Sequence, residues 1–187
     1  MKQKITVTLT AFTIACLFMQ SCSKLASNLQ YDLTMQTGSV DIKIPPISDT
    51  STSLAMGTIT SAYSIDSFIK ANTSNQLGAS NISSAKMSSC TLTILNPTAA
   101  NNFANFQNGT VSFYTNTNTT PFTAATITNN PDTYAESLSS TVDATTDLKS
   151  YLNGNQLTYS LNGKMRRQAT DTITCRVQIT MNVHVHE

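Results

Sequence analysis

Apolar and polar residues alternate strictly near the end of the chain, over residues 172–186. The apolar positions are Ile173, Cys175, Val177, Ile179, Met181, Val183 and Val185, and every residue between them is polar. This period of two predicts a strand with one face buried and the other in water. A strand of that length would span roughly 50 Å, so we expect it to be bent, bulged or shared between two sheets.

Shorter runs with the same alternation occur along the rest of the chain. They cover residues 29–35, 40–44, 90–94, 111–113 and 157–161, and a weak strand is expected over 122–128 among exposed loops. Proline has no backbone N–H to donate to a strand ladder, so Pro45 and Pro46 are expected to end the second of these strands. Short alternating runs of this kind, separated by turn residues, are typical of a β-sandwich or a β-barrel.

A hairpin is expected at Asn162-Gly163. Both central residues of a type I′ turn need a positive φ, which Asn and Gly adopt at little cost. The dipeptide therefore predicts a turn that pairs the strand over 156–161 with a strand starting near Lys164.

Two short helices are expected between the strands, over residues 64–72 and 143–153. Their apolar residues recur at helical spacing, and Asp66 and Asp143 lie near the expected N-termini, where carboxylates are favoured. We therefore predict an all-β fold: a two-layer antiparallel β-sandwich with one or two short peripheral helices, formed by residues 29–187 as a single domain.

A short segment resembles a known kind of sandwich. Residues 89–97 form a strand that ends in Asn-Pro, and Phe103 and Phe106 follow. This resembles the strand-then-Asn-Pro pattern of late-embryogenesis-abundant-like (LEA-like) sandwiches, over less than a tenth of the chain. The resemblance implies an Ig-like or LEA-like sandwich and says nothing about function.

Composition narrows the classes of function. Thr, Ser and Asn make up 70 of the 187 residues, and only 11% of residues are charged, with a formal net charge of +1. Thr and Asn are weak helix formers and Thr suits a pleated surface, which favours the strand interpretation. A near-neutral chain with three Arg lacks the basic surface that nucleic-acid binding needs, so no nucleic-acid partner is expected.

The N-terminus has the pattern of a secretory leader. Lys2 and Lys4 precede an uncharged apolar stretch over residues 5–18, which is shorter than the roughly 20 residues of a spanning helix. Ser21-Cys22 then follows, and this ending resembles the lipobox that signal peptidase II cleaves in bacterial lipoproteins of the Bacteroidetes type. The resemblance implies a signal peptide over 1–21, lipid on Cys22 and a tether over 22–28.

The same resemblance predicts where the protein is located. Several acyl chains on one residue anchor a protein stably where a single chain would be marginal. In the lipoproteins that this N-terminus resembles, an Asp directly after the cysteine marks retention in the inner membrane, and an acidic run marks export to the cell surface. Residues 23–28 contain neither signal. The expected location is the outer membrane, facing the periplasm, with display on the cell surface as the alternative; the membrane itself is then a partner, through the lipid.

Cys90 and Cys175 are the candidate disulfide. Each is on the apolar face of its expected strand, and a disulfide is allowed beyond the inner membrane. The alternative is a pair of buried free thiols, which is a common state for cysteine. No motif of a catalytic cysteine accompanies either residue.

Other candidate chemistry is sparse. His184 and His186 share one strand face and are a weak candidate for a metal site, because catalytic zinc needs three protein ligands and structural zinc four. Arg166 and Arg167 could contact an anionic headgroup or simply be solvated. The sequence contains none of the phosphate-, dinucleotide- or calcium-binding motifs, and we predict no catalytic residue and no cofactor.

Three functions are compatible with these features. The first is a non-enzymatic, membrane-anchored envelope lipoprotein that binds or scaffolds another envelope protein or a glycan. The second is a cell-surface glycan-binding, adhesin or pilus-like module, against which the absence of Trp counts. The third is a glycan hydrolase whose site is built from loops, which would need two convergent carboxylates.

Overall fold

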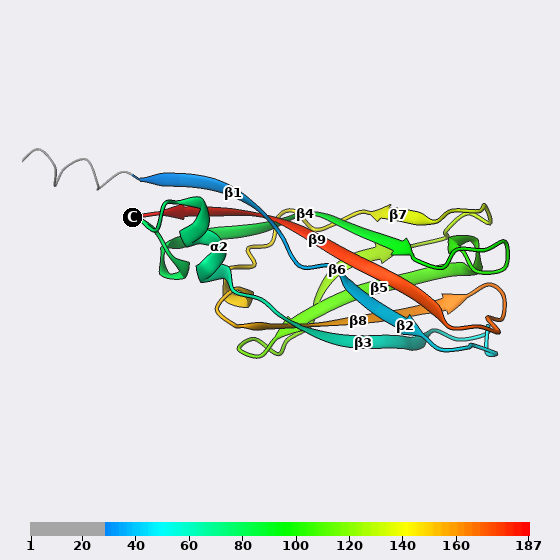
Figure 1. The fold of residues 1–187 in the computed structure, drawn as a ribbon. Coiled ribbons are helices and arrows are strands. Elements are labelled where there is room, and N and C mark those ends of the chain that lie inside the picture. The colour runs from blue at the N-terminus through cyan, green and yellow to red at the C-terminus, as the bar shows by residue number, and fades with distance from the viewer. Residues whose placement is uncertain (1–28) are drawn as a thin grey trace, which may run out of the picture.

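The computed structural model describes residues 29–187. Two antiparallel sheets pack face to face as a β-sandwich, and one α-helix lies at the end of the molecule where the chain terminates (Figure 1). The predicted fold class is therefore confirmed. The signal peptide, Cys22 and the tether lie outside the described residues.

The first sheet is built around the long C-terminal strand β9 (Ile173–His186). One side of β9 pairs with β4 (Ile82–Ile94), which in turn pairs with the short β7 (Ser137–Ser140). The other side pairs with β1 (Gln30–Gln36) and then with β2 (Val40–Ile44). Strand β9 stays within one sheet. Its pairing with β4 has two register irregularities, and in both of them the extra residue lies on β4.

The second sheet has the strand order β3-β8-β5-β6. Its members are β3 (Leu54–Ala62), β8 (Gln156–Met165), β5 (Phe106–Thr115) and β6 (Phe122–Ile127). One apolar core fills the space between the sheets, and its largest fully buried side chains include Tyr159, Phe103, Phe106 and Phe113. The sheets also approach at both sides, where β2 packs against β3 and an isolated bridge joins Thr126 to Thr141.

The hairpin predicted at Asn162-Gly163 is wrong. Both residues lie inside β8, which continues to Met165, and β8 and β9 belong to different sheets. Gly163 is needed there for another reason: a Cβ on it would lie 2.7 Å from the carbonyl oxygen of Asn108 on the neighbouring strand. The Asn-Gly pair thus marks a close backbone approach rather than a turn.

One of the two predicted helices forms. Helix α2 (Ile65–Asn72) is preceded by Ser64, whose hydroxyl accepts a hydrogen bond from the Ser67 N–H, and Asp66 lies in its first turn. The helix predicted over 143–153 is wrong, because that segment contains only a single 3₁₀ turn, η4 (Lys149–Tyr151). Two further 3₁₀ turns precede strands: η2 (Ala79–Asn81) before β4 and η3 (Phe103–Asn105) before β5.

Candidate functional site

The outer face of the first sheet carries polar side chains in rows that cross three strands. We call it the polar face. Asp32 on β1 pairs with His184 on β9, which pairs with Ser84 on β4. The next row consists of Thr34, Asn182 and Lys86. Because alternate residues of a strand share a face, these two rows lie side by side in water above the core.

A shallow, open depression lies over these rows, with a volume of about 560 Å³. The buried residues Met87 and Val183 contribute to its lining. The other lining residues are Asp32, Ser84, Lys86, Ser88, Ala144, Asn182 and His184. Carboxylate, imidazole, ammonium, amide and hydroxyl groups meet here, so the surface offers both donors and acceptors.

His184 and Asp32 form the one ion pair at this depression. His184 Nδ1 lies 2.5 Å from Asp32 Oδ1, an arrangement in which the carboxylate accepts the Nδ1 proton. The side chain of Asp32 is 88% exposed, so water and salt screen the pair. The contact orients the imidazole more than it stabilises the sheet.

The two candidate metal ligands lie close together without a third. The rings of His184 and His186 have centroids 6.2 Å apart, and the Nδ1 of His186 lies 3.1 Å from the backbone oxygen of Glu187. Within residues 29–187, no group of three or more His, Cys, Asp or Glu side chains is placed to hold a metal ion. The pair remains a two-ligand arrangement, short of the three protein ligands of a catalytic zinc.

Cys90 and Cys175 are free, buried thiols in the structure, so the candidate disulfide does not form. They lie on adjacent strands but out of register, since Cys175 pairs with Ile94, four residues beyond Cys90. That offset is roughly 13 Å along a strand, too far for a disulfide. Burial raises the pKa of Cys90 to about 11 and that of Cys175 to about 12, which keeps both unreactive.

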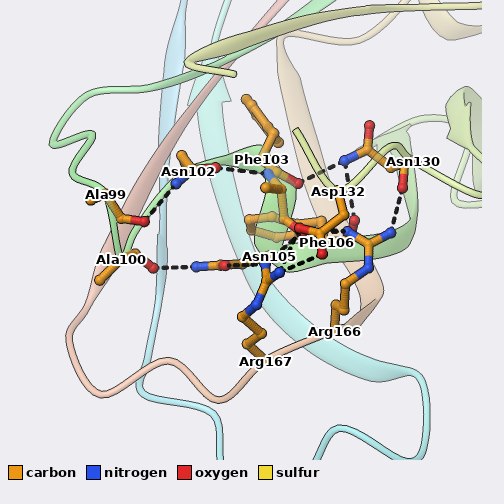
Figure 2. A network of polar contacts seen from close by, with 11 residues as sticks. Ala99, Ala100, Asn102, Phe103, Asn105, Phe106, Asn130, Asp132, Arg166 and Arg167 are labelled. Atoms are coloured by element: carbon orange, nitrogen blue, oxygen red, sulfur yellow. Dashed lines mark hydrogen bonds and ion pairs between the residues drawn. The ribbon is translucent and has the colours of Figure 1, made fainter. Parts of the chain in front are cut away.

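Arg166 is a fixed part of the architecture rather than a free cation. Its guanidinium donates hydrogen bonds to the backbone oxygens of Ala104 and Asn130 (Figure 2). Asn130 in turn donates from its side-chain amide to the carbonyls of Phe103, at 2.7 Å, and of Phe106, at 3.1 Å. The end of β8 is thereby tied to the turn η3 and to the loop before β7.

Arg167 completes this cluster on its solvent side. It donates to the carboxylate of Asp132, with a distance of 2.6 Å to Oδ1, and that hydrogen bond holds the pKa of Asp132 below its usual value (Figure 2). Beneath it, the amide of Asn105 donates to the backbone oxygen of Ala100. The predicted basic cluster is therefore engaged within the protein, and its setting is the end of β8 and not a hairpin.

The sequence did not reveal the part of the polar face that lies on β4. The alternation over 172–186 places Asn182 and His184 on one polar side, and the structure does the same. Ser84 and Lys86 were not identified, because the first half of β4 carries Ser and Ala where an obvious strand carries large apolar residues. The one sequence signal for a strand at Ser84 and Lys86 is the spacing of the apolar residues Ile82, Ala85 and Met87, and a register irregularity interrupts that spacing.

Comparisons with known proteins give no assignment. No family model matches the chain and no curated protein matches it. Among the described residues, no helix is long and apolar enough to cross a membrane.

Three solved viral structures are similar to this chain at a low level. A structure of infectious bursal disease virus, Gt strain, has 10% identity and a TM-score of 0.37 over 85% of this chain. A 60-mer BFDV capsid protein has 11% identity and a TM-score of 0.37 over 86% of this chain and 95% of its own length. Desmodium yellow mottle tymovirus has 12% identity and a TM-score of 0.25, covering 84% of this chain and 90% of its own.

This chain spans 33% of the first of these viral proteins. At these scores and identities, neither a family nor a function follows from the likenesses.

Proposed function

We propose that the protein is a non-enzymatic envelope lipoprotein, anchored through lipid on Cys22, that binds another envelope component on its polar face. The observation that carries the binding role is the pair of polar rows, Asp32-His184-Ser84 and Thr34-Asn182-Lys86. All of these residues except Thr34 line one open depression. A rigid sandwich holds these groups at fixed spacing, which suits recognition by hydrogen bonds.

The shape of the depression favours a large partner over a small molecule. Sites for small molecules are concave and bury most of the ligand surface. The depression here is open to solvent, and its polar side chains stand on the outer face of a sheet, so a protein or glycan surface can meet several of them at once. With ten acidic and eleven basic residues in all, the chain has no strong net charge to steer it, and hydrogen bonds would supply the specificity.

The anchor is tested by metabolic labelling with radioactive palmitate. We expect label in the wild-type chain and none in Cys22→Ala, and we expect globomycin, an inhibitor of signal peptidase II, to accumulate a larger precursor. Equal labelling of the two chains would remove the anchor from the proposal. Protease treatment of intact cells then separates the two locations, because a periplasm-facing chain survives it and a surface-displayed chain is cut.

The binding role is tested with a photo-crosslinking amino acid placed at Asn182. The matched control carries the same residue at Thr60, an exposed position on the second sheet. We expect a discrete adduct from position 182 that Lys86→Glu weakens, and no adduct from position 60. Adducts of equal yield from both positions would mean that the polar face is not the binding surface.

A further inference from the structure

Strand β1 forms an edge of the first sheet, and no strand of the described chain pairs with its outer side. The backbone N–H of Glu187 donates to Leu29 at 3.2 Å, and the N–H of Thr37 donates to Ile179 at 2.9 Å. Hydrogen-bonded pairs alternate along an antiparallel ladder, so the odd residues between 29 and 37 bond to β9. The even residues of β1 therefore direct their N–H and C=O groups away from the sheet.

This edge lacks the usual protection against strand addition. Exposed edges are normally blunted by Lys, Pro, bulges or short length. Strand β1 is seven residues long, pairs in regular register, and has Asp32 as its one charged residue. That carboxylate is directed to His184 within the same chain.

The outer edge of β4 is covered by β7 and by the segment around Leu148, whereas no described segment pairs with the outer edge of β1. Strand β7 pairs with residues 90–93 of β4. Closer to the start of β4, the N–H of Leu148 donates to the carbonyl of Ala85 at 2.7 Å, and the Asp147 carboxylate accepts the N–H of Ala85 at 2.9 Å. Strand β7 and the segment around Leu148 thus supply a cover for the β4 edge, whereas none of the described residues 29–187 pairs with the outer side of β1.

We propose that a second copy of this chain adds to β1 in antiparallel fashion, with the two-fold axis at Leu33, and joins the two first sheets into one. This inference concerns the strand edge and goes beyond the proposed function, which concerns the polar face. The outward backbone groups belong to even residues, so even residues must face even residues across the new ladder. A two-fold axis at Leu33 meets that condition.

Centring on Leu33 also gives the most favourable pairs. All seven residues then have partners, and Asp32 faces Thr34 of the second copy instead of another Asp32. On the inner face, Leu33 meets Leu33, and Tyr31 meets Met35 of the second copy. Tyr31 and Leu33 are only half-buried in the single chain, so pairing removes further apolar surface from water. Centring on Asp32 would bring two like charges together, which is unfavourable.

The proposal is tested by cysteine crosslinking of the full chain in its own membrane. In the proposed register, residue 33 faces itself as a non-hydrogen-bonded pair with Cα atoms about 4.5 Å apart, within reach of a disulfide. Residue 36 lies roughly 20 Å from its own copy. We expect mild oxidant to convert Leu33→Cys to a disulfide-linked dimer and to leave Gln36→Cys monomeric. Equal crosslinking at both positions, or stronger crosslinking of Asp32→Cys, would overturn the proposal.

A second pair of variants avoids any change in the half-buried Leu33. Thr34→Lys and Thr34→Asp remove the same weak hydrogen bond to Asn182, at 3.4 Å, and lie on the exposed face. Opposite Asp32 of the second copy, the lysine attracts and the aspartate repels. Sedimentation of the full chain in detergent should show tighter dimers for Thr34→Lys and weaker dimers for Thr34→Asp, each by about fivefold. A shift in the same direction for both, or none, would refute self-pairing.

Discussion

At the scale of single residues, Asp49 and Asp143 begin two turns of closely similar local structure. The carboxylate of Asp49 accepts from the backbone N–H of Ser51 at 2.7 Å, from its hydroxyl at 2.6 Å, and from the Thr52 hydroxyl at 2.8 Å. Asp143 accepts in the same way from Thr145 and Thr146. These hydrogen bonds to the charged form lower the pKa of Asp49 to about 2 and hold that of Asp143 well below its usual range.

The lowered pKa of Asp49 predicts a pH-dependent contribution to stability. A depressed pKa stabilises the fold above the unfolded value of about 3.9, and this contribution is lost as the pH falls through about 2. Asp49→Asn should therefore melt below the wild type at neutral pH, and the difference in Tm should close as the pH approaches 2. The control is Asp171→Asn, at an exposed position, which should show no such difference. A difference in Tm between Asp49→Asn and the wild type that stays constant across the pH range would contradict this contribution of the lowered pKa of Asp49.

Gly163 shows why one residue-level prediction was wrong. Asn-Gly favours a hairpin locally, but β8 continues through it, and the glycine is required because β5 passes so close. No sequence pattern separates a turn glycine from a glycine selected by a neighbouring strand, since the neighbour is distant in sequence.

Gly163→Ala tests this reason. The added Cβ would meet backbone at 2.7 Å, so we expect a loss of about 1–3 kcal/mol in the free energy of unfolding, measured by urea denaturation. Gly38→Ala is the matched control, because nothing lies within 4 Å of its Cβ position, and it should change stability by less than about 0.5 kcal/mol. Equal effects would mean that close approach does not explain Gly163.

At the scale of secondary-structure elements, alternation found the strands whose buried side chains are large. Strand β9 and the strands over 157–161 and 40–44 carry such residues at every second position. Strand β7, with the sequence SLSS, and β3, with its Ala, Gly and Ser residues, have too few apolar side chains to show the period. They are strands because neighbouring strands pair with them, which is information the local sequence does not contain.

The helix predicted over 143–153 fails for a similar reason. Its first residues form the Asp143 turn, and the Asp147 carboxylate accepts from Ala85 on β4 as well as from the N–H of Lys149. This contact fixes the segment against the edge of β4, where a single 3₁₀ turn remains. A tertiary hydrogen bond to a strand 62 residues away overrides the local helical spacing.

The end of β8 depends on Arg166 more than on Arg167. Arg166→Ala would leave the carbonyl of Asn130 without its charged donor and that of Ala104 with only the long 3.5 Å contact from Arg167, and we expect a loss of about 2 kcal/mol in urea denaturation. Arg167→Ala should cost less than Arg166→Ala, because the ion pair of Arg167 with Asp132 is half exposed and screened by water. Arg166→Lys should restore little of the lost stability, because a lysine ammonium lacks the planar, two-pronged geometry with which the guanidinium donates to both carbonyls. Equal losses of stability for Arg166→Ala and Arg167→Ala would rule out the larger contribution of Arg166.

At the scale of the whole molecule, the low charge of the chain leaves few charged side chains to protect the edges of its sheets. Thr, Ser and Asn supply the polar side of the strands and much of the loops, and few Lys or Glu are left to protect an edge. The sandwich covers the β4 edge with β7 and the segment around Leu148, and packs β2 against β3. The exposed β1 edge is where the proposed second copy adds.

The candidate site was partly predictable for the same physical reason as the fold. Periodicity assigns residues to a face, so His184 and Asn182 were placed correctly on the polar side of β9. It cannot give the order of strands, so the neighbours Asp32 and Lys86 become visible only when β1 and β4 pair on either side of β9. The same limit applies to Cys90 and Cys175, whose strands are adjacent but whose register keeps them apart.

The measurement that tests the proposed binding role most directly is the affinity of the purified domain of residues 29–187, which lacks the lipid-bearing Cys22, for isolated outer membranes. We expect saturable binding that Lys86→Glu weakens by about tenfold or more, because the substitution replaces the ammonium group that lines the depression with a carboxylate. Thr60→Glu, on the outer side of the second sheet, should change the affinity by less than about twofold. Equal loss in both variants, or binding that neither affects, would contradict a partner site on the polar face.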